Sequence, residues 1–384
     1  MRQLKYFFCV FILLFCIVTV LPKLSATVYA SAPTVTTGSS TNVTTSSATL
    51  NGTVNANGTS TTAWFNYSTT SGSYTGTSTT QAVSGTSTTS ISASLSGLSA
   101  PTTYYYRIAA QNGVGTSYGS EASFTTASTQ TFTMNTTIGT SNTTYDGMAI
   151  VVGDGSTATT LTVTGSHTFA SLTVKNNATV THSDADTSNT YSTNLTVTGD
   201  TDIQSGGKID VSSRGYLGGY SVGNNSSYGR TSGNVTTNGS SGHCGGSYGG
   251  LGGQGSSGSI GSTYGDITNP TEPGAGGGGY SSSYIGGDGG GLIRLTVSGT
   301  LTNNGSIVAN GGNAQAADWY NRAGGGAGGG IYINSSTLAG SGTITANGGS
   351  YAGNDGNVGG SGGGRIALIF TTKTFMGGIT VAGV

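Results

Sequence analysis

The sequence predicts an all-β protein in which an antiparallel sandwich is followed by a right-handed parallel β-helix with glycine-rich loops. Short runs that alternate between apolar and polar residues dominate the chain, and no helical period competes with them. Blocks of Ile, Leu and Val recur through the second half, separated by Gly and Asn. Glycine supplies 70 of 384 residues, against an ordinary share of about 7%.

Composition excludes several classes of protein. Lys and Arg number 12 and Asp and Glu 13, too few cations for a nucleic-acid binder that works by bulk positive charge. Cys9 and Cys16 lie in a leader segment, which leaves Cys244 and excludes a disulfide framework. We therefore expect no nucleic-acid partner.

Residues 1–30 have the pattern of a secretory signal peptide. Arg2 and Lys5 precede the apolar run from Phe7 to Leu21, and Val28-Tyr29-Ala30 offers small residues for cleavage. The alternative is a membrane anchor, but the run is shorter than the ~20 residues that span a bilayer. We expect a secreted or cell-surface protein without membrane insertion after signal cleavage.

Residues 33–127 are predicted to form the sandwich. Their alternating runs are separated by Asn-Gly pairs and Ser/Thr-rich loops. The stretches Ser47–Asn55 and Leu95–Arg107 resemble bacterial fibronectin type III repeats. The resemblance implies an immunoglobulin-like sandwich that serves as a spacer or adhesion module. It also implies a core position for Trp64, the alternative being an exposed ring that stacks on sugar.

A tyrosine corner is predicted inside this segment. The spacing between Leu98 and Tyr104 is the one at which the phenol bonds back to the backbone and fixes the crossover.

Residues 128–160 are assigned to a linker and first strands, and residues 161–384 to the repeats. Leu195–Gly199, Gly291–Gly299, Gly330–Ile333 and Gly364–Leu368 align as equivalent starts of four blocks. One block cannot bury its apolar face alone, so we expect the blocks to stack in parallel around a shared core. A second antiparallel sandwich or a flat sheet is the alternative.

Asn310 and Asn347 stand at equivalent places in their blocks. We expect both at turns in left-handed conformation, with side chains that bond to backbone along the stack.

A glycine-rich excursion covers residues 215–290. Three alternatives stay open for it: it is mobile, it lies against the repeats through Tyr rings, or its extended segments stack closely as Gly allows. The region from about 160 onwards resembles the glycine-rich β-helix-like passages of secreted surface and adhesin-type proteins. Because the fourth block stops at Val384, we expect a truncated reading frame or a further chain that caps the stack.

Two carboxylate pairs are the best candidates for chemistry: Asp184 with Asp186, and Asp200 with Asp202. Each pair could hold Ca²⁺ or, with Lys208 or Arg214, act on a polysaccharide. We favour solvated turn carboxylates and expect no catalytic residue and no cofactor, with Ca²⁺ as the alternative. His243 and Cys244 adjoin in a glycine loop, where we expect an exposed thiol without a catalytic role.

We expect a non-enzymatic scaffold or adhesin-type protein that makes weak contacts with carbohydrate or cell surfaces. The alternative is a β-helix polysaccharide lyase or hydrolase with an accessory fibronectin type III module. A third interpretation is self-association through the Gly/Tyr-rich loops.

Overall fold

The computed structural model describes residues 30–316, 322–351 and 358–384. The predicted signal peptide, residues 1–30, lies almost wholly outside the described residues. In the described part of the chain every regular element is a β-strand, which confirms the all-β class. No helix of that part could cross a membrane.

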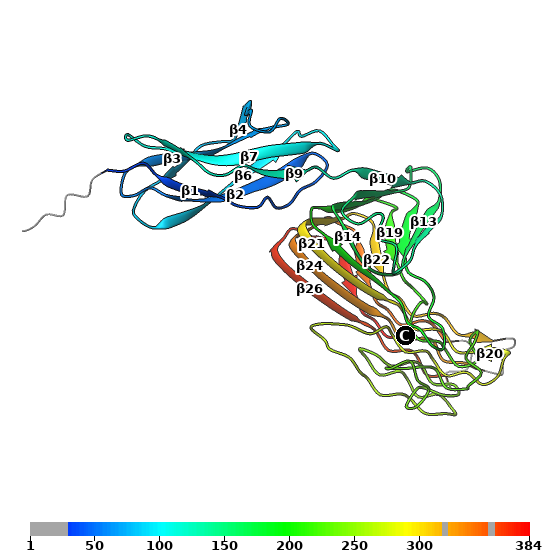
Figure 1. Ribbon diagram of the computed structural model, residues 1–384. Helices are drawn as coiled ribbons and strands as arrows, with labels where there is room; N and C mark the ends of the chain where they lie inside the picture. Colours follow the sequence, from blue (N-terminus) through cyan, green and yellow to red (C-terminus); the bar gives the residue numbers. More distant parts are fainter. Residues whose placement is uncertain (1–29, 317–321, 352–357) are drawn as a thin grey trace, which may run out of the picture. The chain divides into compact units, whose positions relative to one another are not determined.

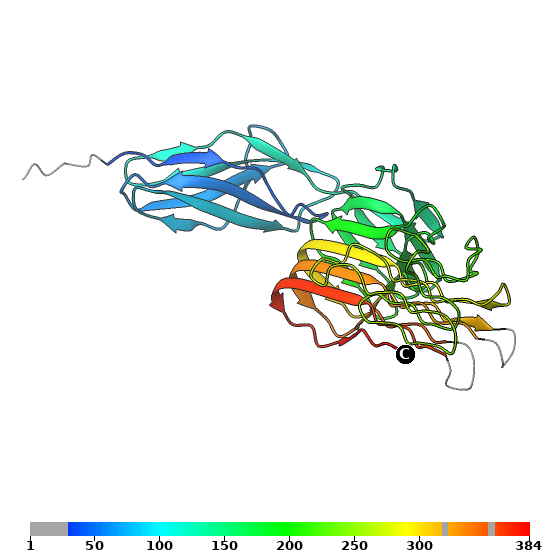
Figure 2. The same ribbon diagram turned by 90° about the horizontal axis from the view of Figure 1, so that it is seen from below.

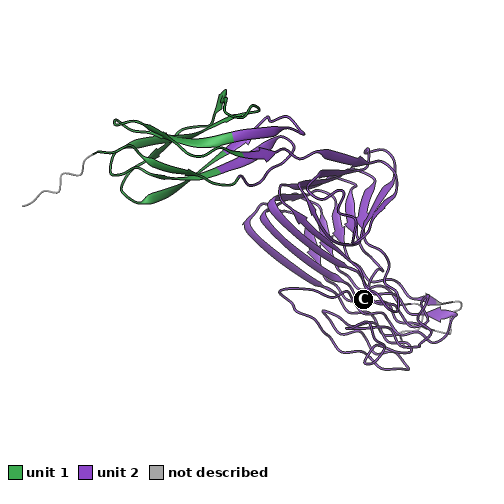
Figure 3. Ribbon diagram, in the orientation of Figure 1, with its two compact units in different colours: residues 1–39, 51–93, 106–122 green, residues 40–50, 94–105, 123–384 purple. Residues whose placement is uncertain are grey.

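The described chain divides into two compact units (Figure 3). The first comprises residues 1–39 (described from residue 30), 51–93 and 106–122, and the second comprises residues 40–50, 94–105 and 123–384. Strands β2, β6 and β7 run from one unit into the other.

Antiparallel pairing characterises residues 34–125. Among described residues one sheet has the order β1-β2-β6, and a second has β4-β3-β7-β8 with β5 on β3 and β9 on β7. The strands are β1 (Thr34–Thr37), β2 (Ser47–Asn55), β3 (Thr61–Ser68), β4 (Gly76–Thr77), β5 (Gln81–Val83), β6 (Thr88–Ser96), β7 (Thr103–Gln111), β8 (Thr116–Tyr118) and β9 (Ala122–Thr125). The predicted corner bond is present, because Ser99 N donates to the Tyr104 hydroxyl at 3.0 Å.

The predicted core position of Trp64 is wrong. Ala63 and Phe65 are fully buried, so the two-residue period of β3 turns the intervening Trp64 to the outer face. There its indole is half-buried and donates to the Asn66 side chain at 2.7 Å.

Parallel pairing characterises residues 129–380. The described chain contributes strands to one sheet of order β10-β12-β15-β18-β21-β17-β14, extended by β24 and β26, and to another of order β11-β13-β16-β19-β22-β25-β27. The first sheet consists of β10 (Thr129–Phe132), β12 (Ala149–Val152), β14 (Gly165–Phe169), β15 (Ser171–Val174), β17 (Ser192–Val197), β18 (Thr201–Ile203), β21 (Leu292–Asn303), β24 (Gly330–Ala339) and β26 (Arg365–Lys373). The second consists of β11 (Thr136–Ile138), β13 (Thr159–Val163), β16 (Ala178–Thr181), β19 (Lys208–Asp210), β22 (Ser306–Val308), β25 (Thr343–Thr345) and β27 (Gly378–Thr380).

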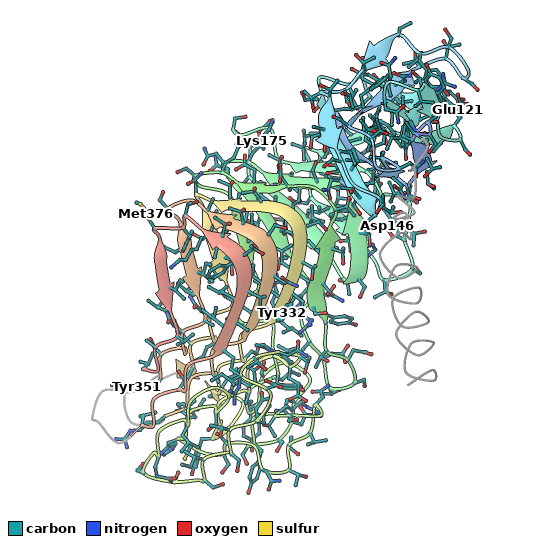
Figure 4. The ribbon with its side chains drawn as sticks, turned by 90° about the vertical axis from the view of Figure 1, so that its left-hand side faces the viewer. Glu121, Asp146, Lys175, Tyr332, Tyr351 and Met376 are labelled. Carbon is teal, nitrogen blue, oxygen red and sulfur yellow. The ribbon has the colours of Figure 1, made fainter. Side chains whose placement is uncertain are left out.

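The predicted parallel stacking of the repeat blocks is confirmed. Leu195 pairs with Leu295, which pairs with Ile333, and Ile333 pairs with Leu368. The strands lie side by side and curl into a half-barrel (Figures 1 and 4). Their inward residues form one continuous core, in which each buried Ile, Leu or Val contributes roughly 1.5–3 kcal/mol of burial free energy.

The two equivalent asparagines form a ladder along the stack. Asn310 Oδ1 accepts from Asn347 N at 2.8 Å, and Asn347 Oδ1 accepts from Ala382 N at 2.8 Å. The predicted bonding to backbone is therefore confirmed. The predicted left-handed conformation is wrong, because neither residue has a positive φ.

The glycine-rich excursion forms a bundle of extended segments. We use "glycine bundle" for residues 214–219, 227–230, 240–250, 274–279, 286–291, 309–312, 324–329, 346–350 and 358–364. These segments carry no strand assignment, yet most of their residues are buried. They run beside one another at the end of the parallel strands (Figures 1 and 2).

Backbone hydrogen bonds in the bundle follow a period of three. In the segment 274–279, the amides of residues 274 and 277 donate to carbonyls within 287–290. Those of residues 276 and 279 donate to carbonyls within 227–230, and that of residue 278 donates to Cys244. Three residues per turn is the period of the polyproline II conformation, which directs successive residues toward different neighbours.

Glycine is required where these segments touch. A Cβ on Gly277 would overlap the carbonyl oxygen of Gly324, and one on Gly289 would overlap that of Gly274. Of the three alternatives for residues 215–290, close stacking of extended glycine segments is the one observed. Tyr rings add to it, since Tyr216 and Tyr248 are buried beside Tyr264.

Candidate ligand-binding surface

The structure places the two predicted carboxylate pairs at opposite ends of one strand. Asp184 and Asp186 lie in the loop before β17, whereas Asp200 and Asp202 lie after it. The six residues of β17 span about 20 Å at 3.3 Å per residue. Glycosidase carboxylates stand roughly 5–9.5 Å apart, so the strand holds the two pairs too far apart to act together on one glycosidic bond.

Each of these carboxylates is engaged locally. Asp186 accepts the amides of Ser188 and Asn189 at 2.7 Å, which hold its pKa below the ordinary value. Asp200 Oδ1 accepts from Thr300 N at 2.7 Å on the adjacent coil. Asp202 accepts from the Gln204 side chain at 3.2 Å.

The two predicted basic partners differ in what they contact. Arg214 forms an ion pair with Asp184 at 2.5 Å. Lys208 pairs with Asp210 at 3.1 Å instead of with a predicted aspartate. Among the described residues, no group of three His, Cys, Asp or Glu side chains is placed to hold a metal ion.

A titratable group that the sequence did not single out lies near the Asp184–Arg214 pair. Asp288 accepts the amide of Gly218 at 2.7 Å. Burial raises the pKa of Asp288, and the charge of Asp184 raises it further. His182 is fully buried nearby in the chain, and burial lowers its pKa to about 4. Asp184, Arg214 and Asp288 thus link the loop after β16 to the glycine bundle. The buried imidazole of His182 is neutral.

The predicted exposure of the Cys244 thiol is wrong. Cys244 is fully buried in the glycine bundle, its sulfur lies 3.6 Å from the Ser257 carbonyl oxygen, and burial raises its pKa. The bundle closes over this position because its backbone segments pack at glycine-to-glycine distance.

An apolar groove lies beside the last strands. Its volume is about 560 Å³, and Leu251, Ile267, Ile366, Ile379 and Val381 line it. Strands β26 and β27 are sheet edges in the described chain. The structure shows no segment seated in the groove among the described residues.

Four tyrosines gather where the bundle segments turn. We call Tyr220, Tyr228, Tyr280 and Tyr284 the tyrosine tip. Strand β20 (Tyr284–Ile285), which pairs with β23 (Gln315–Ala316), marks the end of the bundle remote from the parallel sheets (Figure 1). Tyr332, in contrast, lies where those sheets meet the bundle (Figure 4).

Backbone bonds fix the tip at the glycines beside its tyrosines. Gly279 N donates to the Ser227 carbonyl at 3.0 Å, and these two residues immediately precede Tyr280 and Tyr228. The bond therefore places the two tyrosines on adjacent segments. Gly219, which precedes Tyr220, accepts from Gly286 N at 2.8 Å. Tyr-Gly or Gly-Tyr pairs within glycine runs are the sequence signal that could have indicated this surface.

Two tyrosines of the tip are exposed and two are half-buried. Tyr280 is 57% exposed and Tyr228 43%, whereas Tyr220 and Tyr284 are half-buried. The Tyr280 ring lies 6.5 Å from the Tyr284 ring and 5.8 Å from the His243 imidazole, centroid to centroid. Such an array offers apolar faces with hydroxyl groups at their edges.

Tyr220 has a strained backbone. Its φ is +59°, a left-handed conformation that is a genuine outlier for a bulky residue. Its amide donates to the Ser226 carbonyl at 2.9 Å, which closes the turn between two bundle segments. Strain of this kind costs about 1–3 kcal/mol and concentrates at ligand-binding sites.

Polar groups flank the exposed Tyr280 ring. His243 Nδ1 lies 2.9 Å from the Ser256 hydroxyl and 3.3 Å from that of Ser257. Arg322 donates to the Ser256 hydroxyl at 3.4 Å. Burial and then the Arg322 charge lower the pKa of His243, so its imidazole is neutral at pH 7.

Comparison with known proteins assigns no family. No family model and no curated protein matches the chain. Three solved structures of the sensor domain of the anti-sigma factor RsgI4 from Pseudobacteroides cellulosolvens are similar in part. The shorter version has 20% identity and a TM-score of 0.21, and covers 26% of this chain and 97% of that one.

The other two structures of that domain give comparable values. The solution structure has 21% identity, a TM-score of 0.21 and coverage of 24% and 74%. The longer version has 22% identity, a TM-score of 0.20 and coverage of 24% and 88%. At these values the likeness carries no functional assignment.

Proposed function

We propose that this chain is a secreted, non-enzymatic adhesin-type scaffold that binds carbohydrate through the tyrosine tip. The observation that carries the proposal is an array of exposed and half-buried tyrosine rings held by backbone hydrogen bonds at the turns of the glycine bundle. Binding residues are often loop residues positioned by a rigid scaffold. Tyrosine supplies contact area at low conformational cost, together with a hydroxyl for hydrogen bonding.

The architecture that we propose for this role has two parts. Residues 33–127 form a fibronectin type III-like sandwich, and the repeats from residue 161 form a right-handed parallel β-helix. The antiparallel pairing and the Ser99–Tyr104 bond support the first assignment. The alternation of the chain between two parallel sheets, in register from coil to coil, supports the second.

Secretion to the cell surface or the extracellular medium is part of the proposal. It rests on the leader pattern of residues 1–30. The separation of the Asp184 and Asp200 pairs favours this proposal over the lyase or hydrolase alternative.

Glycan binding by variants of the tip tests the function. The chain is applied to an array of neutral polysaccharides and oligosaccharides, alongside Tyr280→Ala and Tyr280→Ala/Tyr284→Ala. We expect binding to at least one neutral glycan, reduced about tenfold or more by each variant, as for aromatic residues at the centre of an interface. Tyr191→Ala, which removes a half-buried tyrosine from the loop before β17, is the matched control.

Two results would contradict the proposal. Failure of the unaltered chain to bind any glycan would remove carbohydrate as the ligand. Equal binding by Tyr280→Ala, Tyr191→Ala and the unaltered chain would move the site away from the tip. Light scattering on the same samples distinguishes self-association, which would raise apparent binding in proportion to particle size.

A further inference from the structure

A second polar and aromatic site lies in the first unit. Arg107 projects from the outer face of β7, and its guanidinium lies between two tyrosine rings. The distance from its central carbon to the ring centroid is 4.4 Å for Tyr74 and 4.0 Å for Tyr118. Two cation–π contacts thereby hold the planar cation, and stacking restricts its orientation.

The nearby Glu121 carboxylate forms its hydrogen bonds with groups other than the Arg107 guanidinium. Glu121 accepts from Ser71 Oγ at 2.6 Å, from Gly72 N at 2.8 Å and from the Tyr74 hydroxyl at 2.5 Å. These three donors lower the pKa of Glu121, and the Arg107 charge lowers it further, so the carboxylate is ionised but bonds to neutral donors. Glu121 thus holds the turn that carries Tyr74 against the guanidinium.

No hydrogen bond within the described residues uses the Arg107 guanidinium. Its Nε is buried, so a ligand carboxylate would meet the guanidinium end-on, at Nη1 and Nη2. An arginine fixed in this way has lost its side-chain freedom before a ligand arrives, so a bound carboxylate gains the full benefit of two parallel N–H···O bonds.

Aromatic surface adjoins the fork. Tyr118, whose ring contacts Arg107, is 51% exposed. Trp64 lies on the outer face of β3, the strand beside β7 in the same sheet. The site thus offers a guanidinium for a carboxylate and aromatic rings for a flat, C–H-rich sugar ring. A uronic acid within a polysaccharide carries both of these groups.

We propose that Arg107, stacked between Tyr74 and Tyr118, binds the carboxylates of acidic, uronic-acid-containing polysaccharides. The site lies on the antiparallel sheet of the first unit and does not depend on the tyrosine tip. Tyr118 stacks on the sugar that carries the carboxylate or on its neighbour. The sandwich is then a binding module in its own right.

Polygalacturonate and its methyl ester test the proposal with the unaltered chain. The two polymers share a backbone and differ in the free carboxylate. We expect the chain to bind polygalacturonate at least tenfold more tightly by isothermal titration calorimetry in 0.15 M salt, where weak nonspecific attraction is screened. Equal affinity for the two polymers would overturn the proposal without reference to any variant.

Two substitutions then distinguish bidentate hydrogen bonding by the planar guanidinium from attraction to its positive charge alone. Arg107→Gln and Arg107→Lys are both expected to abolish the preference, since Lys keeps the charge but cannot form the planar bidentate contact. Lys175→Gln removes one cation from the second unit, where Lys175 lies on the surface (Figure 4), and should keep the preference. Thermal unfolding checks that each variant is folded.

The remaining outcomes also decide the matter. Retention of the preference by Arg107→Lys would show charge attraction alone and refute the fork. Binding of poly-glutamate as tightly as polygalacturonate would refute recognition of sugar and assign the site to acidic peptides.

Discussion

The substitution Gly277→Ala tests whether the glycine bundle is a packed structure. Its new Cβ would overlap the carbonyl oxygens of Gly324 and Gly325, so residues 274–279 must move away from their neighbours. Movement endangers the bonds from Gly277 N to Gly287 O at 2.9 Å and from Gly219 N to Gly277 O at 2.8 Å. Two backbone bonds at about 1 kcal/mol each, with about 1–3 kcal/mol for overpacking, give a loss of roughly 3–5 kcal/mol.

Amide hydrogen exchange followed by mass spectrometry measures this loss locally, which matters because a chain of two units need not unfold in one step. Peptides from residues 274–291 should exchange at least about a hundredfold faster in Gly277→Ala, since each tenfold change corresponds to about 1.4 kcal/mol. Gly139→Ala is the control, because a Cβ there meets nothing within 4 Å and its φ is not positive. If the unaltered chain already exchanges these amides at the rate of an unstructured peptide, the packed bundle is refuted.

Three further outcomes follow from the geometry. Asn347→Ala removes the acceptor of Ala382 N and the side-chain rung between coils, so the unfolding free energy of the second unit should fall by about 1 kcal/mol in urea titrations. Leu295→Ala, at a core position 1% exposed, should cost about 2–5 kcal/mol, whereas Trp64→Ala on an outer face should cost less than half as much. His182 has a folded pKa of about 4 against about 6.5 unfolded, so the unfolded chain binds the extra proton. Its stabilising contribution is complete above about pH 6.5 and is lost as the pH falls towards 4, by about 3 kcal/mol. His182→Gln should flatten that part of the stability profile, and an unchanged slope would contradict the buried neutral imidazole.

The sequence carried enough information to predict the stack but not the bundle. Ile, Leu and Val at alternate positions identify strands, and matched blocks identify their register, because side chains make those contacts. In the bundle the contacts are between backbones, and glycine has no side chain to mark which segment it will touch. The partners of residues 274–279 could therefore not be deduced from any local period.

The error at Trp64 has a different cause. Residues 63–67 carry apolar groups on both parities, so alternation alone allows either face to be the core. The small Ala63 was less conspicuous than the large indole, yet it shares the buried face with Phe65. Packing between the sheets decided the matter.

The candidate carboxylates illustrate the limit of proximity in sequence. Asp184 and Asp202 lie close along the chain, but an extended strand of six residues separates their pairs. Asp288 is distant in sequence, yet the charge of Asp184 raises its pKa. In stacked coils, residues at equivalent places in successive coils lie close together. Spacing along the sequence alone does not show which acidic residues these are.

The bundle also dictates an order of assembly. Arg365 donates to the Tyr248 and Tyr264 carbonyls, and the first of these contacts spans 117 residues. Residues 240–250 leave the ribosome long before the coil that holds them exists, and such distant closure is slow. Until β26 forms, this passage lacks the Arg365 contacts, so the glycine bundle closes only after the last coil has been synthesised.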